Sequence, residues 1–119
     1  MKKIIYSPGE PSGIGTDLII KLSSSNLWED LKIPVVSIGD PKLFLDRAAL
    51  LKKKIRIIEL ESLSQVSKNC KGLIQIIKVT KCSNTRPGKL YKSNAQYVLD
   101  NLTYSIEQTM QNEETALVT

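Results

Sequence analysis

A short apolar segment, a loop rich in glycine and proline, and an amphipathic segment follow one another at the start of the chain. They read Lys3-Ile4-Ile5-Tyr6, then Ser7-Pro8-Gly9-Glu10-Pro11-Ser12-Gly13-Ile14-Gly15-Thr16, then a segment that begins at Asp17. This order predicts a strand, a tight turn and a helix. Because the first N–H groups of a helix have no intrahelical partner and its dipole adds positive charge there, such a loop favours an anion.

The loop admits two interpretations, because its spacing fits neither of the common phosphate-binding patterns. Leu18 stands where the third glycine of a dinucleotide-binding G-x-G-x-x-G would be, and no Gly-Lys-Ser/Thr follows the glycines. In one interpretation, the glycines let a phosphate or a carboxylate approach the backbone. In the other, they only allow the helix and the sheet to pack closely. Both interpretations predict the same strand–turn–helix unit.

The rest of the chain alternates between apolar strands and helical segments, which predicts an α/β fold with a mostly parallel sheet and flanking helices. The predicted strands span residues 4–7, 34–38, 55–60, 73–77 and 116–118, and the predicted helices span residues 17–24, 41–51 and about 93–111. Asp40 is placed to cap the second helix, with Pro41 at its first position. We expect the first, second and last strands to be neighbours, because right-handed crossovers place such strands side by side.

The last predicted helix has an apolar stripe at the spacing i, i+3, i+4, formed by Ala95, Val98, Leu99, Leu102, Ile106 and Met110. Ser93 or Asn94 is its expected cap. Such a stripe is typical of a helix that faces the core. We therefore expect Leu102 to be fully buried against the sheet.

Length and composition indicate one modest soluble domain. The chain has 119 residues, of which 41% are hydrophobic and 24% are charged. No apolar run is long enough to cross a bilayer, and none follows Met1-Lys2-Lys3 as in a signal peptide, so we expect a cytoplasmic protein with no membrane partner. The spacing of Cys70 and Cys82 indicates reduced, partly buried thiols rather than a metal site or a disulfide.

The formal net charge of +5 raises the question of a nucleic-acid partner. The basic residues are scattered, apart from Lys52-Lys53-Lys54 and Arg56, which follow the second predicted helix and complement its dipole. Aromatic residues make up only 5% of the chain and form no RNA-binding signature. We therefore expect no nucleic acid as a partner.

The loop also carries a resemblance to a known family. The run Pro8-Gly9-Glu10-Pro11-Ser12-Gly13-Ile14-Gly15-x-Asp17 closely resembles the opening motif of the 4-hydroxythreonine-4-phosphate dehydrogenase family, which usually has proline where Thr16 stands. Further segments resemble the same family in the same order: Ile38-Gly39-Asp40, Leu45-Asp46-Arg47-Ala48, Gly88-Lys89, Ala95 to Leu99, and Thr115 to Thr119. The resemblance therefore covers nearly the whole chain, and its first motif is the specific one.

This resemblance implies that residues 1–119, without an internal boundary, are the N-terminal α/β fragment of a larger enzyme with an isopropylmalate dehydrogenase-like two-domain fold. That family oxidises 4-phosphohydroxy-L-threonine with NAD in pyridoxal phosphate biosynthesis, to a 3-oxo product that decarboxylates to 3-amino-2-oxopropyl phosphate. The resemblance also implies a homodimer and a divalent metal (zinc, magnesium or cobalt) held by histidines. The chain contains no histidine. We therefore assign no catalytic or metal residue, and we expect the chain to be inactive alone.

The resemblance also provides the candidate ligand residues. The corresponding loop of this superfamily lies at the cleft between two domains. Gly9, Gly13 and Gly15 are thus expected to let cofactor or substrate approach, and Glu10 and Asp17 to orient it by hydrogen bonds. For Asp17, the interpretation that it caps or stabilises the helix N-terminus is preferred, so Glu10 is the better candidate for a ligand contact. An alternative function is a small, non-catalytic nucleotide- or phosphate-binding α/β module.

Overall fold

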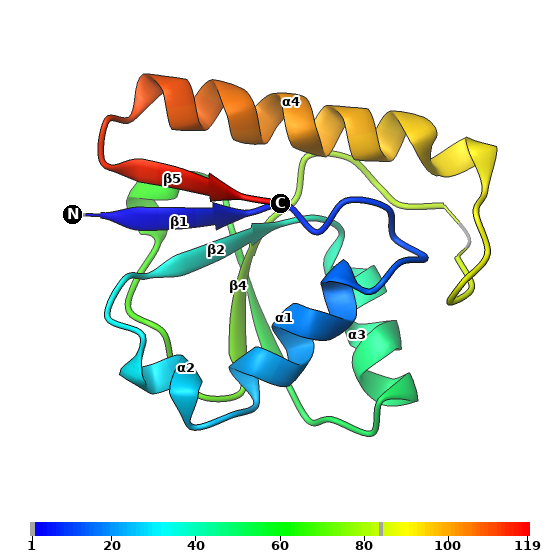
Figure 1. Cartoon of the computed structure of the whole chain (residues 1–119), viewed down its shortest axis with the longest axis horizontal. Coiled ribbons are helices and arrows are strands. Elements are labelled where there is room, and N and C mark those ends of the chain that lie inside the picture. Colours follow the sequence, from blue (N-terminus) through cyan, green and yellow to red (C-terminus); the bar gives the residue numbers. More distant parts are fainter. Residues whose placement is uncertain (1, 84) are drawn as a thin grey trace.

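The computed structural model describes residues 2–83 and 85–119 and shows a sheet between two layers of helices (Figure 1). In chain order, the elements are β1 (Lys3–Tyr6), α1 (Gly15–Ser23), α2 (Leu27–Asp30), β2 (Val35–Ile38), α3 (Pro41–Leu50), β3 (Arg56–Leu60), the 3₁₀ turn η1 (Leu63–Gln65), β4 (Leu73–Ile77), the 3₁₀ turn η2 (Lys92–Asn94), α4 (Ala95–Gln111) and β5 (Thr115–Val118). This arrangement confirms the predicted fold class.

Within the described residues, the sheet has five strands in the order β3-β4-β2-β1-β5, and every pair of neighbours is parallel. Ile5 of β1 lies opposite Val36 of β2 on one side and opposite Leu117 of β5 on the other. This register confirms that the first, second and last strands are neighbours. β2 is buried at every position, as expected for a strand covered on both faces.

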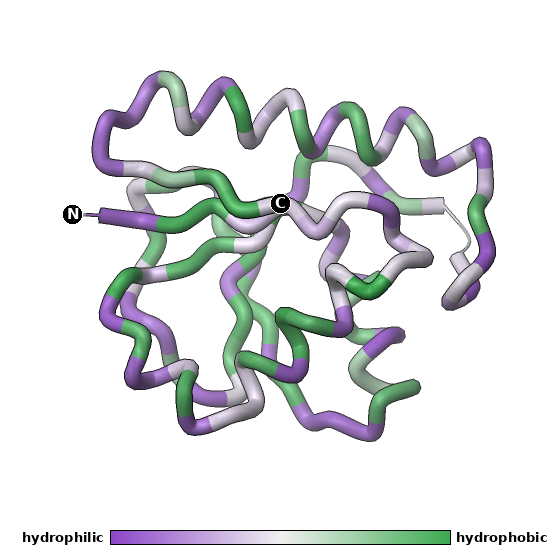
Figure 2. Tube along the Cα trace, viewed as in Figure 1, coloured by the Kyte–Doolittle hydropathy of each residue, from purple (hydrophilic) through white to green (hydrophobic). Residues whose placement is uncertain are grey.

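Buried side chains fill the space between the sheet and each of its two layers. On one face, Ile20 of α1, Trp28 of α2 and Phe44 of α3 belong to one cluster with Val35 and Ile74 of the sheet. On the opposite face, the cluster consists of Ile5, Val36, Ile38, Leu63, Val66 and Ile77, with Tyr104 of α4 and Leu117 of β5 packed against it. The strands are mainly hydrophobic but include hydrophilic residues, as at the start of β1, whereas α4 alternates between hydrophilic and hydrophobic residues along its length (Figure 2).

The short helix α2 was not predicted. Trp28 is 1% exposed, and its indole N–H donates to the carbonyl oxygen of Leu73 at 3.2 Å. A helix of four residues is too short for an apolar periodicity to reveal it. One anchored tryptophan, rather than a repeating pattern, therefore fixes this turn against β4.

Both ends of α3 follow from local chemistry. The Asp40 carboxylate accepts a hydrogen bond from the backbone N–H of Lys42 at 3.1 Å, and Pro41 occupies the first helical position, so the predicted cap is confirmed. The helix ends before Lys52, whose φ of 56° is left-handed and cannot continue an α-helix. The buried positions of α3 are Leu43, Phe44, Arg47 and Ala48, so a charged residue stands on its core-facing side.

α4 does not present its apolar stripe to the sheet. Leu99, Ile106 and Met110 are 56%, 42% and 81% exposed, and Leu102 is only half-buried. The prediction that Leu102 is fully buried was therefore wrong. Asn94 does occupy the N-cap position, but its side chain makes no capping hydrogen bond.

The face of α4 that packs on the sheet carries Tyr97, Asn101 and Ser105, which recur every four residues. α4 contacts the edge strand β5 and its neighbour β1. The Tyr97 hydroxyl accepts a hydrogen bond from the backbone N–H of Asp40 at 2.9 Å. This buried polar contact, rather than apolar area, sets which side of the helix faces inward.

Across residues 2–83 and 85–119, no helix combines the length and the apolarity that crossing a lipid bilayer requires.

Candidate functional site

Three loops meet at the carboxyl edge of the sheet, where the strands end. They follow β1, β2 and β4, and hydrogen bonds join them. The backbone N–H of Gly88 donates to the carbonyl oxygen of Ser12 at 2.8 Å, and the backbone N–H of Cys82 donates to the Asp40 carboxylate at 2.9 Å. The loop predicted to bind a ligand therefore belongs to a larger cluster, whose other members come from distant parts of the sequence.

The glycines of the first loop have structural reasons to be glycine. Gly9 has a φ of +82°, which side chains rarely adopt. A Cβ on Gly15 would lie 2.2 Å from the carbonyl oxygen of Pro8, which is too close for any other residue. A Cβ on Gly13 would lie 3.3 Å from the carbonyl oxygen of Glu10, a tight contact. The close approach of the α1 start to the loop supports the packing interpretation for Gly15.

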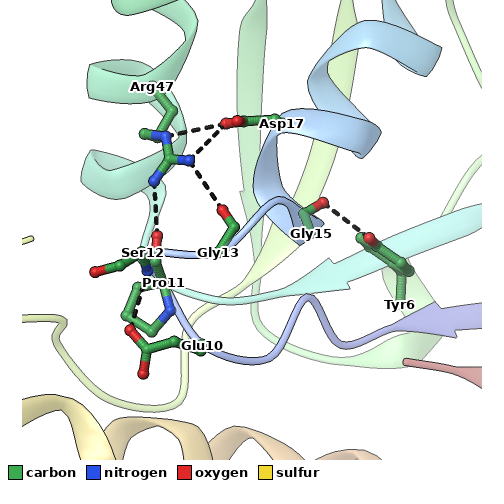
Figure 3. Close-up of polar contacts among 8 residues, drawn as sticks. All are labelled: Tyr6, Glu10, Pro11, Ser12, Gly13, Gly15, Asp17 and Arg47. Carbon is green, nitrogen blue, oxygen red and sulfur yellow. Dashed lines mark hydrogen bonds and ion pairs between the residues drawn. The ribbon is translucent and has the colours of Figure 1, made fainter. Parts of the chain in front are cut away.

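Glu10 folds the loop back on itself. Its carboxylate accepts a hydrogen bond from the N–H of Ser12 at 3.0 Å, and its carbonyl oxygen accepts one from the N–H of Gly13 at 3.0 Å (Figure 3). Two backbone donors that could have faced an anion are therefore occupied within the loop. A phosphate site made from this turn alone finds little support in this geometry.

Arg47, which belongs to α3, binds the same loop. Its guanidinium donates to the carbonyl oxygens of Pro11 and Gly13 at 2.8 and 2.9 Å, and it forms an ion pair with Asp17 at 2.9 Å (Figure 3). The Arg47 side chain is 4% exposed. A buried guanidinium needs such partners, because an unpaired charge in the interior is costly.

Asp17 lies in the first turn of α1, which begins at Gly15, two residues earlier than predicted. There its negative charge complements the helix dipole, and its carboxylate binds Arg47. The Tyr6 hydroxyl donates to the carbonyl oxygen of Gly15 at 2.8 Å and so fixes the same helix start from the sheet. Burial raises the pKa of Tyr6 above its ordinary value, so it keeps this proton at neutral pH.

Arg47 is the site residue to which sequence reasoning assigned no role. It stands within a segment that carried the family resemblance, yet nothing local indicates its partners. The available signal is its position, since Leu43, Phe44 and Ala48 place it on the apolar side of a helix. A cation on such a side indicates a buried acceptor elsewhere in the fold.

Asp40 connects the loop after β2 to α3, to the segment after β4 and to α4. One carboxylate oxygen caps α3, the other accepts from Cys82, and its backbone N–H donates to Tyr97. Burial raises the pKa of Tyr97 to about 12, so its hydroxyl stays neutral. These contacts confirm the capping interpretation of Asp40 and leave neither of its oxygens without a partner.

Cys82 is a neutral thiol rather than a nucleophile. Burial raises its pKa to about 11, and the nearby carboxylates of Asp40 and Glu10 push it in the same direction. Cys82 and Cys70 are both free and partly buried, as predicted. The first loop borders the segment that follows β4, because the backbone N–H of Gly88 donates to the carbonyl oxygen of Ser12.

A cavity of about 900 Å³ opens between α3 and the segment from Lys81 to Tyr91. Its lining residues are Asp40, Lys42, Leu43, Asp46, Arg47, Leu50, Lys81, Cys82, Ser83, Thr85, Arg86, Pro87 and Tyr91. Of the five predicted ligand residues, none lines this cavity: Gly9, Glu10 and Gly13 lie in the turn after β1, and Gly15 and Asp17 lie in the first turn of α1. Asn84 lies outside the described residues.

The residues present do not fit the divalent metal that the family resemblance implies. Among residues 2–83 and 85–119, no three side chains of histidine, cysteine, aspartate or glutamate are grouped so that they could hold a metal ion. Asp40 and Cys82 lie close together, but Asp40 is committed to backbone donors. We therefore propose no chemical role for a metal ion bound to this chain.

The parallel sheet, the helices on both faces and the loop cluster at the carboxyl edge place the chain among open parallel α/β domains. Such domains bind ligands at that edge. No family model matches the sequence. Individual proteins do match it, and they have one description in common.

The chain is similar along its whole length to proteins described as 4-hydroxythreonine-4-phosphate dehydrogenase. The identity is 29% over 119 residues for the protein of Citrobacter koseri, 31% over 117 residues for that of Yersinia enterocolitica and 32% over 118 residues for that of Shewanella frigidimarina. These matches cover 98–100% of this chain but only 34–35% of each relative. The chain is thus a relative of these dehydrogenases over about one third of their length.

Solved structures of the same description have the same fold. The dehydrogenase of Klebsiella pneumoniae superimposes with a TM-score of 0.82 at 21% identity, over 99% of this chain and 37% of that one. The dehydrogenase of Burkholderia phymatum gives a TM-score of 0.79 at 16% identity, over 93% of this chain and 33% of that one. The fold of this chain therefore occurs as about a third of a larger protein.

Proposed function

We propose that the chain is the N-terminal part of an NAD-dependent dehydrogenase that oxidises 4-phosphohydroxy-L-threonine in the cytoplasm. The product is a 3-oxo compound that decarboxylates to 3-amino-2-oxopropyl phosphate, in pyridoxal phosphate biosynthesis. The observation that carries this proposal is the similarity of the whole chain to about one third of the dehydrogenases of that name. In its complete form the enzyme is proposed to be a homodimer.

In this proposal, the chain contributes one wall of the active-site cleft. The loop from Gly9 to Asp17 is held by Arg47 and Tyr6, so it is ordered before any ligand arrives. A preorganised loop can position cofactor or substrate without the entropic cost of ordering it. Glu10 is the candidate contact, because its side chain is partly exposed at this edge. In this proposal, the metal ligands and the rest of the cleft lie in the remainder of the enzyme, which corresponds to the two thirds of these relatives that the chain does not match.

A chimera tests the proposal. The chain replaces the 118 matched residues of the Shewanella frigidimarina dehydrogenase, and NADH formation is followed with 4-phosphohydroxy-L-threonine and NAD. We expect the chimera to form NADH and the 119-residue chain alone to form none above background. A chimera that is folded by circular dichroism yet forms no NADH would contradict the proposal, as would activity of the chain alone.

A conservative pair of variants in the chimera tests the loop. Glu10→Gln keeps an oxygen that can accept from the N–H of Ser12 but removes the charge. We expect it to lower kcat/KM about tenfold, the effect of losing one charge-assisted hydrogen bond. Glu59→Gln, at an exposed position of β3, is the matched control and should leave kcat/KM unchanged. Equal values for the two variants would show that Glu10 serves only the turn.

A further inference from the structure

α4 forms the outer layer on one side of the sheet, and it carries apolar residues on the side that faces away from the sheet (Figure 1). We call this set the outer stripe; its members are Ala95, Leu99, Leu102, Ile106 and Met110, of which all but Leu102 are exposed. They recur at intervals of three and four residues, so they form one continuous row along the helix. A contiguous exposed apolar surface is typical of a contact with another macromolecule.

The inner side of α4 is fixed by buried polar contacts, so the outer stripe cannot turn toward the sheet. The Tyr97 hydroxyl accepts from the backbone N–H of Asp40 at 2.9 Å, and the Ser105 hydroxyl donates to the carbonyl oxygen of Asn101 at 2.7 Å. Rotating the helix would break the contact between Tyr97 and Asp40 and leave a buried N–H without its acceptor. The outer stripe is therefore a constant feature of the folded chain.

The charges at the two ends of α4 are placed unfavourably for their own helix. Lys92 lies in η2, directly before α4, and Glu113 follows the last turn; both are exposed. Within residues 2–83 and 85–119, no hydrogen bond or ion pair engages either side chain. A helix dipole is positive at its start and negative at its end, so it disfavours a cation at the first position and a carboxylate at the second.

A second copy of the same helix, running antiparallel, would reverse this disadvantage. The outer stripe has its midpoint between Leu102 and Thr103, and Lys92 stands as far before this midpoint as Glu113 stands after it. A two-fold axis at this midpoint brings each Lys92 beside Glu113 of the other copy, at the negative end of the other helix. It also brings the small side chain of Ala95 opposite the long one of Met110.

We propose that the outer stripe of α4 is a contact between two copies of this chain, related by a two-fold axis and with their α4 helices antiparallel. The charge complementarity of Lys92 and Glu113 favours a second copy over an unrelated partner. One face of one helix is small for an interface, so the dimer is weak and dissociates on dilution. This contact does not rest on the proposed dehydrogenase function, and the homodimer proposed for the complete enzyme does not require it.

Zero-length cross-linking of amines to carboxylates with a carbodiimide, followed by mass spectrometry of the peptides, tests the proposed geometry. Lys92 and Glu113 of one chain lie at opposite ends of α4, about 30 Å apart by the rise of an α-helix. A zero-length cross-link between them can therefore form only between two copies. We expect this cross-link in the dimer band, and a dimer fraction that rises with concentration in sedimentation velocity.

Exchanging the two charges tests the pairing itself. Lys92→Glu should raise the dissociation constant of the dimer about tenfold or more, because the two-fold axis makes each changed contact occur twice and places like charges together. Adding Glu113→Lys to Lys92→Glu should restore the affinity, since it restores opposite charges across the interface. A double variant as weak as Lys92→Glu would overturn the proposed pairing.

A pair of leucine variants tests the apolar part. Leu99→Gln should raise the dissociation constant about tenfold, whereas Leu45→Gln, at a similarly exposed position of α3, should leave it unchanged. Equal dissociation constants for these two variants would overturn the proposal. So would a chain that is folded by circular dichroism but stays monomeric, in which case the stripe serves a different partner or another part of a larger protein.

The chimera decides the case in which circular dichroism shows the chain alone to be unfolded. It carries the same α4, and absence of the cross-link between Lys92 and Glu113 in the folded chimera would then overturn the proposal. NADH formation has no part in these measurements. An inactive chimera that forms the cross-link would therefore count against the dehydrogenase function and not against this contact.

Discussion

Arg47 connects the predicted loop to the rest of the molecule. Its guanidinium makes four contacts. Two are hydrogen bonds to the carbonyl oxygens of Pro11 and Gly13, and the other two are a hydrogen bond from Nε and an ion pair from Nη2, both to the same carboxylate oxygen of Asp17. Their strength depends on burial, since a paired charge inside the protein is stable only while every partner is present. The loop owes its shape as much to this residue of α3 as to its own glycines and prolines.

Arg47→Met should destabilise the chain by about 3–5 kcal/mol, because it leaves Asp17 and two carbonyl oxygens without their partner. Urea denaturation followed by circular dichroism measures the change. Lys42→Met removes a cation from the same helix but from an exposed pair, and it should leave the midpoint nearly unchanged. Similar midpoints for the two variants would show that the buried pair contributes little.

The glycines of the loop should differ in their tolerance of alanine. Gly15→Ala places a methyl group against the backbone of Pro8 and should cost about 2 kcal/mol, as other overpacked substitutions do. Gly9→Ala meets no atom within 4 Å, so only its positive φ opposes the change, at about 1 kcal/mol. The same urea titration ranks them. A larger loss at Gly9 would mean that backbone conformation, not close approach, selects these glycines.

At the scale of the element, α4 shows why an apolar stripe does not by itself identify the buried face. The stripe has helical spacing, and the prediction of a helix there is confirmed. Periodicity reports that a helix has an apolar side, but not which surface that side meets. The inward side of α4 is instead chosen by Tyr97, whose hydroxyl meets the backbone of Asp40.

Two substitutions on α4 should therefore differ in their cost to the free energy of unfolding, with the smaller change in side chain costing more. Tyr97→Phe removes the acceptor for a buried N–H and should cost about 1–3 kcal/mol despite the loss of a single oxygen atom. Leu99→Ala removes more atoms from a side chain that is 56% exposed and should cost less than about 0.5 kcal/mol. Thermal or urea unfolding compares them. A greater loss for Leu99→Ala would restore the apolar stripe as the packed face.

At the scale of the whole molecule, the strands of the sheet differ in how deeply their side chains are buried. Ile5 of β1 and Val36 and Ile38 of β2, two strands that are paired on both sides, have no exposed surface. β5 lies at one edge and pairs only with β1, and its residues alternate between half-buried and exposed. Beside it, an apolar groove of about 260 Å³ lies between α1 and the sheet, lined by residues that include Leu18, Leu22 and Val118.

Hydrogen exchange should reveal this gradient. Amides of β1 and β2 should exchange slowest, because opening them requires the loss of both packed clusters. Amides of β5 should exchange faster, since the edge strand can open while the central strands remain paired. NMR-detected exchange in D₂O measures each strand. Equal protection of β5 and β2 would mean that the sheet opens as one unit.

The sequence by itself determined the local structure of this protein. Strand and helix types follow from apolar periodicity, and the start of α3 follows from Asp40 and Pro41, because a cap and a first-turn proline act on neighbouring residues only. The parallel order of β1, β2 and β5 also followed, since crossover handedness limits the choices. α2 escaped prediction because a single tryptophan, not a pattern, holds it in place.

The tertiary structure decided which distant groups meet. Arg47 lies 30 residues from Asp17, Tyr97 lies 57 residues from Asp40, and the cavity combines α3 with the segment after β4. Such contacts depend on how the strands are ordered and on which face each connection crosses. Local preferences carry no information about them, because a buried donor or charge selects its partner from whatever the packed fold brings within reach.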